Sequence, residues 1–315
     1  MGARVGFLFP GQGSQKVGMG RDFYEAFPLA RDLYEEANQA LGWDVARLSF
    51  EGPDDQLQLT LYTQPAILVH SYVAYRLLRG RGFEPLVALG HSLGEYSALL
   101  AAGAVGYSQA LRIVQKRGEY MHGAVPPGQG AMAAILGLER ARVEAFCRGV
   151  QAQGGTVEPA NYNAPQHVVV AGERGAVEAV VALARAAGAR RAILLAVSAP
   201  FHCTLMRGAQ ERLARELERV EFQDLRFPVF ANVSARKVTR GNEARVALSQ
   251  QVTSPVFWED SLRSVVAEGV DAVVEMGPGR VLSGLSRRIA EGLPVFNVED
   301  VESLERTAEA LAALP

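Results

Sequence analysis

Short apolar runs alternate along the chain with longer segments in which apolar residues recur every three or four positions. The short runs predict buried strands, and the periodic segments predict helices. Strands are expected over residues 4–9, 85–89, 229–232 and 272–275. Helices are expected over 21–41, after Gln64-Pro65, over 95–102, from a Ser108 cap to about Met121, and after Gly277-Pro278-Gly279. Such alternation is typical of a parallel sheet with helices on both faces.

The middle of the chain has a different rhythm, which begins after the linker Pro126-Pro127-Gly128-Gln129-Gly130. Its expected elements follow the order β-α-β-β-α-β, with strands over 131–136, 156–161, 168–171 and 189–195, and helices over 139–150 and 174–187. This order is the ferredoxin-like pattern. The sequence therefore predicts an α/β fold: a parallel-sheet, α/β-hydrolase-like core over 1–127 and 197–315, with a ferredoxin-like subdomain inserted at 128–196.

One serine lies on a predicted turn between a strand and a helix, in Gly90-His91-Ser92-Leu93-Gly94. The two glycines permit a tight backbone there, and the turn would hold Ser92 out at the edge of the sheet, at a helix N-terminus. This G-x-S-x-G context predicts a nucleophile. The alternative is a glycine-rich turn in which Ser92 only caps the helix.

A serine hydroxyl needs a base to take its proton, and His202 is the best placed of the five histidines. It follows a predicted strand, where a loop residue can meet a serine from another strand of a parallel sheet. His91 is next to Ser92, so its side chain should point elsewhere. The alternative for His202 is a histidine that merely begins a helix.

An acyl-transfer site also needs donors for the developing oxyanion. The Leu93 N–H follows the nucleophile, and the Gln12 N–H lies in a glycine-containing loop after the first strand. A phosphate-binding loop is not favoured, because neither Gly-Lys-Ser/Thr nor G-x-G-x-x-G follows. Arg117 falls on an apolar helical stripe and therefore needs an anionic partner or a polar cavity. An anionic partner could be a substrate carboxylate or, in a structural ion pair, a nearby Asp or Glu.

Composition narrows the class of protein. The chain has 315 residues, 49% hydrophobic content and a formal net charge of −2, with scattered arginines, so no overall field favours nucleic acid or an anionic membrane. Cys147 and Cys203 form no C-x-x-C pair, and predict neither a metal site nor a disulfide scaffold. The N-terminal residues enter a strand directly, and no apolar stretch could span a bilayer. We expect a cytoplasmic protein.

Several motifs together resemble the malonyl-CoA:acyl carrier protein transacylase family, in order over nearly the whole chain. They are Gly11-Gln12-Gly13-Ser14-Gln15, Gly90-His91-Ser92-Leu93-Gly94-Glu95-Tyr96, Gln115-Lys116-Arg117-Gly118, Asn161-Tyr162-Asn163-Ala164-Pro165, Ser198-Ala199-Pro200-Phe201-His202, Ser254-Pro255-Val256-Phe257-Trp258 and Glu275-Met276-Gly277-Pro278-Gly279. The resemblance implies transfer of a malonyl group from coenzyme A to the phosphopantetheine thiol of acyl carrier protein, through a malonyl ester of Ser92, for fatty acid biosynthesis.

The resemblance also implies the site residues. His202 would act as base and then as acid, the Leu93 and Gln12 amides would form the oxyanion hole, and Arg117 would hold the malonyl carboxylate. The backbone carbonyl that orients the histidine in this family matches Gln251 here. No cofactor or metal is implied beyond the coenzyme A thioester substrate. A monomer without nucleic-acid or membrane partners is expected.

Two other functions remain open at this point. A serine hydrolase would share the elbow, but it would need an acid between Ser92 and His202 in chain order and often carries a His-Gly-Gly-Gly motif, which this sequence lacks. A non-catalytic subunit that docks a carrier protein would not require an intact Ser92 and His202.

Overall fold

The computed structural model describes residues 3–197 and 199–314, so Ser198 of the motif before His202 lies outside the described residues. Its larger sheet has the strand order β10-β9-β1-β2-β7-β8. The first five strands in that order are parallel, and β8 pairs antiparallel with β7. The strands are β1 (Val5–Phe9), β2 (Val87–Gly90), β7 (Val229–Phe230), β8 (Lys237–Val238), β9 (Ala272–Met276) and β10 (Val295–Val298).

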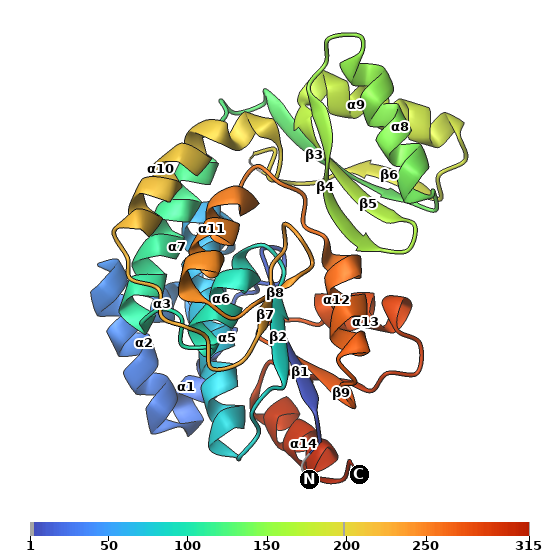
Figure 1. Ribbon diagram of the computed structural model, residues 1–315. Helices are drawn as coiled ribbons and strands as arrows, with labels where there is room; N and C mark the ends of the chain where they lie inside the picture. The colour runs from blue at the N-terminus through green and yellow to red at the C-terminus, as the bar shows by residue number, and fades with distance from the viewer. Residues whose placement is uncertain (1–2, 198, 315) are drawn as a thin grey trace.

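Helices cover both faces of this sheet (Figure 1). Side chains alternate along β1: Phe7 and Phe9 pack into the core that contains Tyr75, while Leu8 packs on the other face with Trp258. The helices of this part are α1 (Arg21–Ala26), α2 (Pro28–Leu41), α3 (Val45–Glu51), α4 (Asp54–Leu57), α5 (Thr60–Gly80), α6 (Leu93–Ala101), α7 (Tyr107–His122), the 3₁₀ turn η1 (Thr204–Met206), α10 (Arg207–Glu218), α11 (Gly241–Gln251), α12 (Trp258–Ala267), α13 (Val281–Ile289) and α14 (Val301–Ala312).

A separate four-stranded antiparallel sheet stands apart from the larger body in Figure 1. Its strand order is β4-β5-β3-β6, and two helices pack against it around their own hydrophobic core. The chain order is β3 (Gly130–Leu136), α8 (Arg140–Gln151), β4 (Val157–Ala164), β5 (His167–Glu173), α9 (Arg174–Ala186) and β6 (Arg191–Leu194). The molecule is therefore a mixed α/β protein with one mainly parallel and one antiparallel sheet.

Backbone contacts join the smaller sheet to the larger body beside β4. The Tyr162 N–H donates to the Val256 carbonyl, and the Val256 N–H donates to the Ala160 carbonyl, both at 2.9 Å. The Arg140 guanidinium lies 3.5 Å from the centre of the Tyr162 ring and also bonds Asp260 on α12. These contacts fix this part of β4, and with it Asn161, against the start of α12 and the segment before it.

Three sequence predictions about helices were wrong in detail. The helix expected over 21–41 is broken at Phe27, whose backbone is extended because the following Pro28 disfavours a helical conformation before it. Helix α5 begins at Thr60 and contains Pro65 in its interior. Ser108 does not cap α7, because the helix begins one residue earlier and the Ser108 hydroxyl donates to Glu36 instead.

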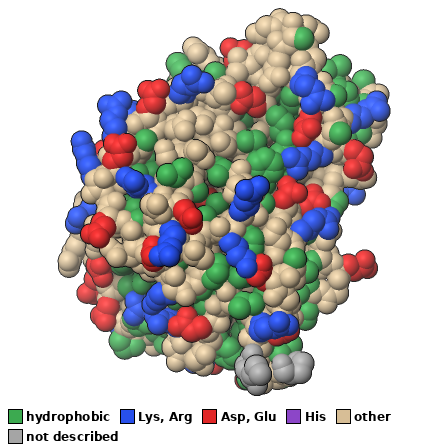
Figure 2. Space-filling view, in the orientation of Figure 1, with side chains coloured by type: hydrophobic (Ala, Val, Ile, Leu, Met, Phe, Trp, Pro, Cys, Tyr) green, Lys and Arg blue, Asp and Glu red, His purple; other side chains and the backbone are tan. Residues whose placement is uncertain are grey.

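The surface carries mixed charge. On the face shown in Figure 2, basic and acidic side chains are interspersed, and neither gathers into a broad stripe. Within residues 3–197 and 199–314, no helix is both long enough and apolar enough to cross a membrane.

A buried histidine in α5 predicts acid sensitivity of the fold. His70 is fully buried against Phe23, and burial lowers its pKa from 6.5 to about 4. Below pH 6.5 the unfolded chain therefore binds a proton that the folded chain does not, so stability present above pH 6.5 is lost as the pH falls toward 4. Between pH 7 and 4, the wild type should lose roughly 3 kcal/mol more unfolding free energy than His70→Leu. Urea unfolding at several pH values measures this, and parallel pH curves for the two proteins would contradict it.

Candidate active site

The turn that carries Ser92 forms where the backbones of β1, β2 and α6 pack closely together. Ser92 lies between the end of β2 and the start of α6, with φ 52° and ψ −106°, a conformation that residues other than glycine rarely adopt. A Cβ on Gly90 would lie 1.9 Å from the carbonyl group of Gly94, and a Cβ on Gly94 would lie 1.9 Å from the Phe9 carbonyl oxygen. Both glycines are therefore required for β1, β2 and α6 to meet at this point.

Gly94→Ala is accordingly expected to destabilise the protein by about 3 kcal/mol, because two backbone segments must separate to admit the methyl group. Gly149→Ala, in the interior of α8, is the matched control. Nothing lies within 4 Å of the Cβ it would add, so it should be neutral or slightly stabilising. Urea denaturation compares the two variants, and equal unfolding free energies would refute the packing argument.

His202 meets Ser92 across the end of the sheet. Its Nε2 lies 2.7 Å from Ser92 Oγ, and its Nδ1 lies 2.9 Å from the Gln251 carbonyl oxygen. Because a carbonyl can only accept, Nδ1 carries the proton, and Nε2 is left to accept the serine O–H. Burial and the neighbouring Arg117 charge lower the pKa of His202 to about 3, which keeps the imidazole neutral.

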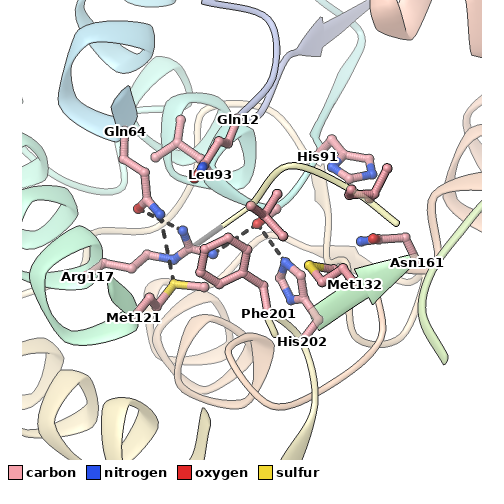
Figure 3. A pocket seen from close by; sticks show the side chains of 13 residues that line it. Gln12, Gln64, His91, Leu93, Arg117, Met121, Met132, Asn161, Phe201 and His202 are labelled. Carbon is pink, nitrogen blue, oxygen red and sulfur yellow. Dashed lines mark hydrogen bonds between the residues drawn. The ribbon is translucent and has the colours of Figure 1, made fainter. Parts of the chain in front are cut away.

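Arg117 on α7 is fully buried, and Figure 3 shows its side chain beside those of Gln64 and Met121. Its Nη2 donates to Ser92 Oγ at 3.0 Å and to Gln251 Oε1 at 2.8 Å, and its Nη1 donates to Gln64 Oε1 at 2.8 Å. Among the ion pairs of the described chain, none involves Arg117. A nearby Asp or Glu was one of the partners expected for Arg117 from the sequence. None of the described ones bonds it directly, and the neutral amides of Gln64 and Gln251 accept its hydrogen bonds instead.

A cavity of about 120 Å³ opens beside Ser92. It is lined by Gln12, Gln64, His91, Ser92, Leu93, Arg117, Met121, Met132, Asn161, Leu195, Val197, Phe201 and His202. Leu93 is the first residue of α6, so its N–H is one of the groups that a helix start leaves without a helical acceptor. The Gln12 loop packs tightly on the elbow, because a Cβ on Gly11 would lie 2.5 Å from the His91 carbonyl oxygen.

The residues singled out from the sequence thus come together. Ser92, His202, Arg117, Leu93 and Gln12 all line the cavity, while Gln251 does not line it and contacts three of them, Arg117, His202 and Ser92. His91 does point away from Ser92, because its Nε2 is 2.8 Å from Asn163 Oδ1.

Three buried polar residues of the site were missed by sequence reasoning. Gln64 bonds Arg117, Asn232 accepts the Ser92 N–H at 2.8 Å, and Glu95 accepts from the Gln251 amide. Each stands in an apolar segment, and a polar side chain in such a segment is the signal that could have found it. In residues 3–197 and 199–314, no three His, Cys, Asp or Glu side chains cluster as metal ligands.

Comparison with known proteins defines the class. Residues 6–305 match the acyl transferase domain family. The chain is 42% identical to the malonyl CoA-acyl carrier protein transacylase of Bacillus subtilis (strain 168), over 98% of both chains. It is 43% identical to that of Escherichia coli (strain K12), over 96% of this chain and 98% of the relative.

Solved structures similar to this chain belong to the same family. An acyl carrier protein S-malonyltransferase from Vibrio cholerae superposes with a TM-score of 0.94 at 43% identity, over 97% of this chain and 100% of the other. A malonyl-transacylase solved in complex with a type II PKS acyl-carrier protein gives a TM-score of 0.95 at 43% identity, over 98% of this chain and 100% of the other. This chain is therefore an acyltransferase. It belongs to the malonyl CoA-acyl carrier protein transacylase family.

Proposed function

We propose that this protein moves a malonyl group from coenzyme A to the phosphopantetheine thiol of an acyl carrier protein, and so supplies fatty acid biosynthesis. The observation that carries the proposal is the position of Ser92 Oγ, 2.7 Å from His202 Nε2 and 3.0 Å from Arg117 Nη2. A neutral base and a buried cation thus both contact the oxygen atom of the nucleophile. Acyl transfer to and from a carboxylated substrate needs those three groups.

The first half-reaction makes an ester. Ser92 Oγ attacks the thioester carbonyl while His202 Nε2 takes its proton, and the Leu93 and Gln12 amides stabilise the oxyanion. The carbon–sulfur bond then breaks, and the His202 imidazolium protonates the departing thiolate. The second half runs in reverse: His202 takes the proton of the carrier thiol, the thiolate attacks the malonyl ester, and Ser92 recovers its proton.

Arg117 gives the site its preference for a carboxylated acyl group. A malonyl carboxylate can accept two parallel N–H···O bonds from the guanidinium, whereas an acetyl group cannot. Binding this carboxylate also offsets the Arg117 charge that lowers the pKa of His202. The base therefore strengthens when the correct substrate is in place.

The Gln251 carbonyl takes the orienting part that an acid plays in many serine enzymes. It holds the Nδ1 proton of His202 and leaves Nε2 directed at Ser92. A neutral acceptor stabilises the imidazolium less than a carboxylate would, but the thioester leaving group needs less help than an amine. This part of the proposal rests on the 2.9 Å contact.

We assign the larger body, over 1–127 and 197–315, to an α/β-hydrolase-like core, and 128–196 to an inserted ferredoxin-like subdomain. The elbow after β2 supports the first assignment. The strand order β4-β5-β3-β6, the chain order of its elements and a separate hydrophobic core support the second.

The chemistry proposed here uses malonyl-CoA and an acyl carrier protein as its substrates and calls for no cofactor or metal, since His202 makes every proton transfer. We propose a cytoplasmic monomer without nucleic-acid or membrane partners. The scattered charges and net charge of −2 support that view.

Mass spectrometry tests the function. After mixing with malonyl-CoA, the intact protein should gain one malonyl group and release coenzyme A, and added holo acyl carrier protein should then remove that group onto its own thiol. Release of free malonate without transfer would indicate a hydrolase instead. An unmodified protein with all malonyl-CoA intact would indicate a docking subunit.

A further inference from the structure

A buried carboxyl group lies beneath the serine turn and takes no part in the mechanism above. Glu95, in the first turn of α6, is 1% exposed. Its Oε2 accepts hydrogen bonds from Gln251 Nε2 and from the Asn232 N–H, the latter at 3.3 Å. Burial of a charged carboxylate costs free energy unless the group is paired and hydrogen-bonded. A buried carboxyl group three residues after the nucleophile is therefore a candidate for a role in the site.

Gln251 connects this carboxyl group to the cation of the site. Its Oε1 accepts from Arg117 Nη2 at 2.8 Å, while its Nε2 faces Glu95 and also donates to the Ser92 carbonyl at 3.0 Å. Arginine can only donate and a carboxylate can only accept, so the amide has one orientation that satisfies both. Glu95 and the Ser92 carbonyl, both acceptors, therefore fix which end of the Gln251 side chain meets Arg117, and of these two only Glu95 can carry a charge.

The Gln251 side-chain amide lies between two opposite charges, the Arg117 guanidinium and the Glu95 carboxylate. Within the described chain, no hydrogen bond or ion pair joins Glu95 and Arg117 directly. A direct bidentate pair would occupy the guanidinium edge that a substrate carboxylate needs. With Gln251 between them, the negative charge still favours a buried, charged Arg117. Among the residues that the structure describes, the guanidinium bonds only the neutral groups of Gln64, Gln251 and Ser92, so a substrate carboxylate has no ion pair to break.

We propose that Glu95 is a positioning residue, which acts through Gln251 to hold Arg117 charged and directed at the acyl group, and so sets the preference for carboxylated acyl chains. This inference rests on the proposed malonyl transfer. Burial raises the pKa of Glu95 to about 7, while the hydrogen bonds from Gln251 and Asn232 and the Arg117 charge favour the ionised form. Kinetic tests therefore belong at pH 8, where the carboxylate form predominates.

The test is the ratio of kcat/KM for malonyl-CoA to that for acetyl-CoA in Glu95→Gln, which keeps the shape and removes the charge. We expect the ratio to fall about tenfold, a size typical of couplings between residues of one hydrogen-bond network. In an Arg117→Ala background, the same substitution should leave the ratio unchanged, because the group through which Glu95 acts is gone. An equal loss for both substrates, or the same fall in both backgrounds, would overturn the proposal.

Two further variants keep the result interpretable. Glu275 on β9 is also a fully buried carboxyl group, but it accepts from the Leu282 and Ser283 amides at the start of α13. Glu275→Gln is therefore the matched control, and its ratio should equal that of the wild type. Glu95→Asp keeps the charge and should retain more of the preference than Glu95→Gln; an Asp variant no better than the Gln variant would contradict the role of charge.

Failure of this inference is distinct from failure of the proposed function. A wild type that forms no malonyl adduct would defeat the transfer itself. A wild type that is malonylated normally, together with a Glu95→Gln variant of unchanged ratio, would defeat only the role given to Glu95. Thermal melting of each variant confirms that the compared proteins are folded.

Discussion

Replacing Arg117 with alanine is expected to cut kcat/KM for malonyl-CoA by roughly 30-fold to several thousandfold, because removal of one partner from a desolvated, hydrogen-bonded charge pair costs about 2–5 kcal/mol. Acetyl-CoA offers no carboxylate, so its kcat/KM should hold steady or rise. Arg117→Lys should recover only part of the loss, since an ammonium group lacks the planar fork. Steady-state kinetics with both substrates makes the measurement.

Arg112 provides the control for that experiment. It lies on the same helix, but its side chain is exposed. Arg112→Ala should therefore leave both substrates unaffected. If Arg117→Ala lowered kcat/KM equally for malonyl-CoA and acetyl-CoA, Arg117 would serve the fold or bind coenzyme A, and the argument for selectivity would fail.

Replacing His202 with alanine should slow both half-reactions by about 10²–10⁴-fold, the usual contribution of a positioned general base and acid. The reason is the 2.7 Å contact between its Nε2 and Ser92 Oγ, which no other histidine makes in the described chain. Stopped-flow release of coenzyme A measures the first half-reaction, and transfer to the carrier thiol measures the second.

His122, at the end of α7, is a suitable control histidine because it lies outside the cavity lining. His122→Ala should retain the wild-type rates. A folded His202→Ala variant with near wild-type acylation would show that another group takes the serine proton.

Local patterns predicted a mixed α/β fold and singled out several residues that the structure places around one cavity. The Ser92 elbow could be found because the glycines, the strand and the helix that form it are neighbours in sequence. Arg117 stood out because a charge on an apolar helical stripe is unusual. The break at Phe27 also has a local cause, because the proline after it disfavours a helical backbone and is visible in the sequence.

The features of the site that local patterns did not predict depend on contacts between distant segments. Gln251 could be proposed only from the family resemblance, since 49 residues separate its carbonyl from His202. Glu95 is 156 residues from the amide that it accepts from, and no periodicity predicts that pairing. Buried polar networks of this kind form only when helices and strands pack, so their partners are fixed by tertiary structure.

The central claim is that Ser92 carries the malonyl group between the two thiols. Its most direct test is peptide mapping after a brief reaction with malonyl-CoA and acid quenching. The account predicts the added malonyl mass on Ser92, located within its peptide by fragmentation, and no adduct on that peptide in Ser92→Ala. Malonyl mass on Ser14, Ser97, Cys147 or Cys203 in place of Ser92 would contradict it.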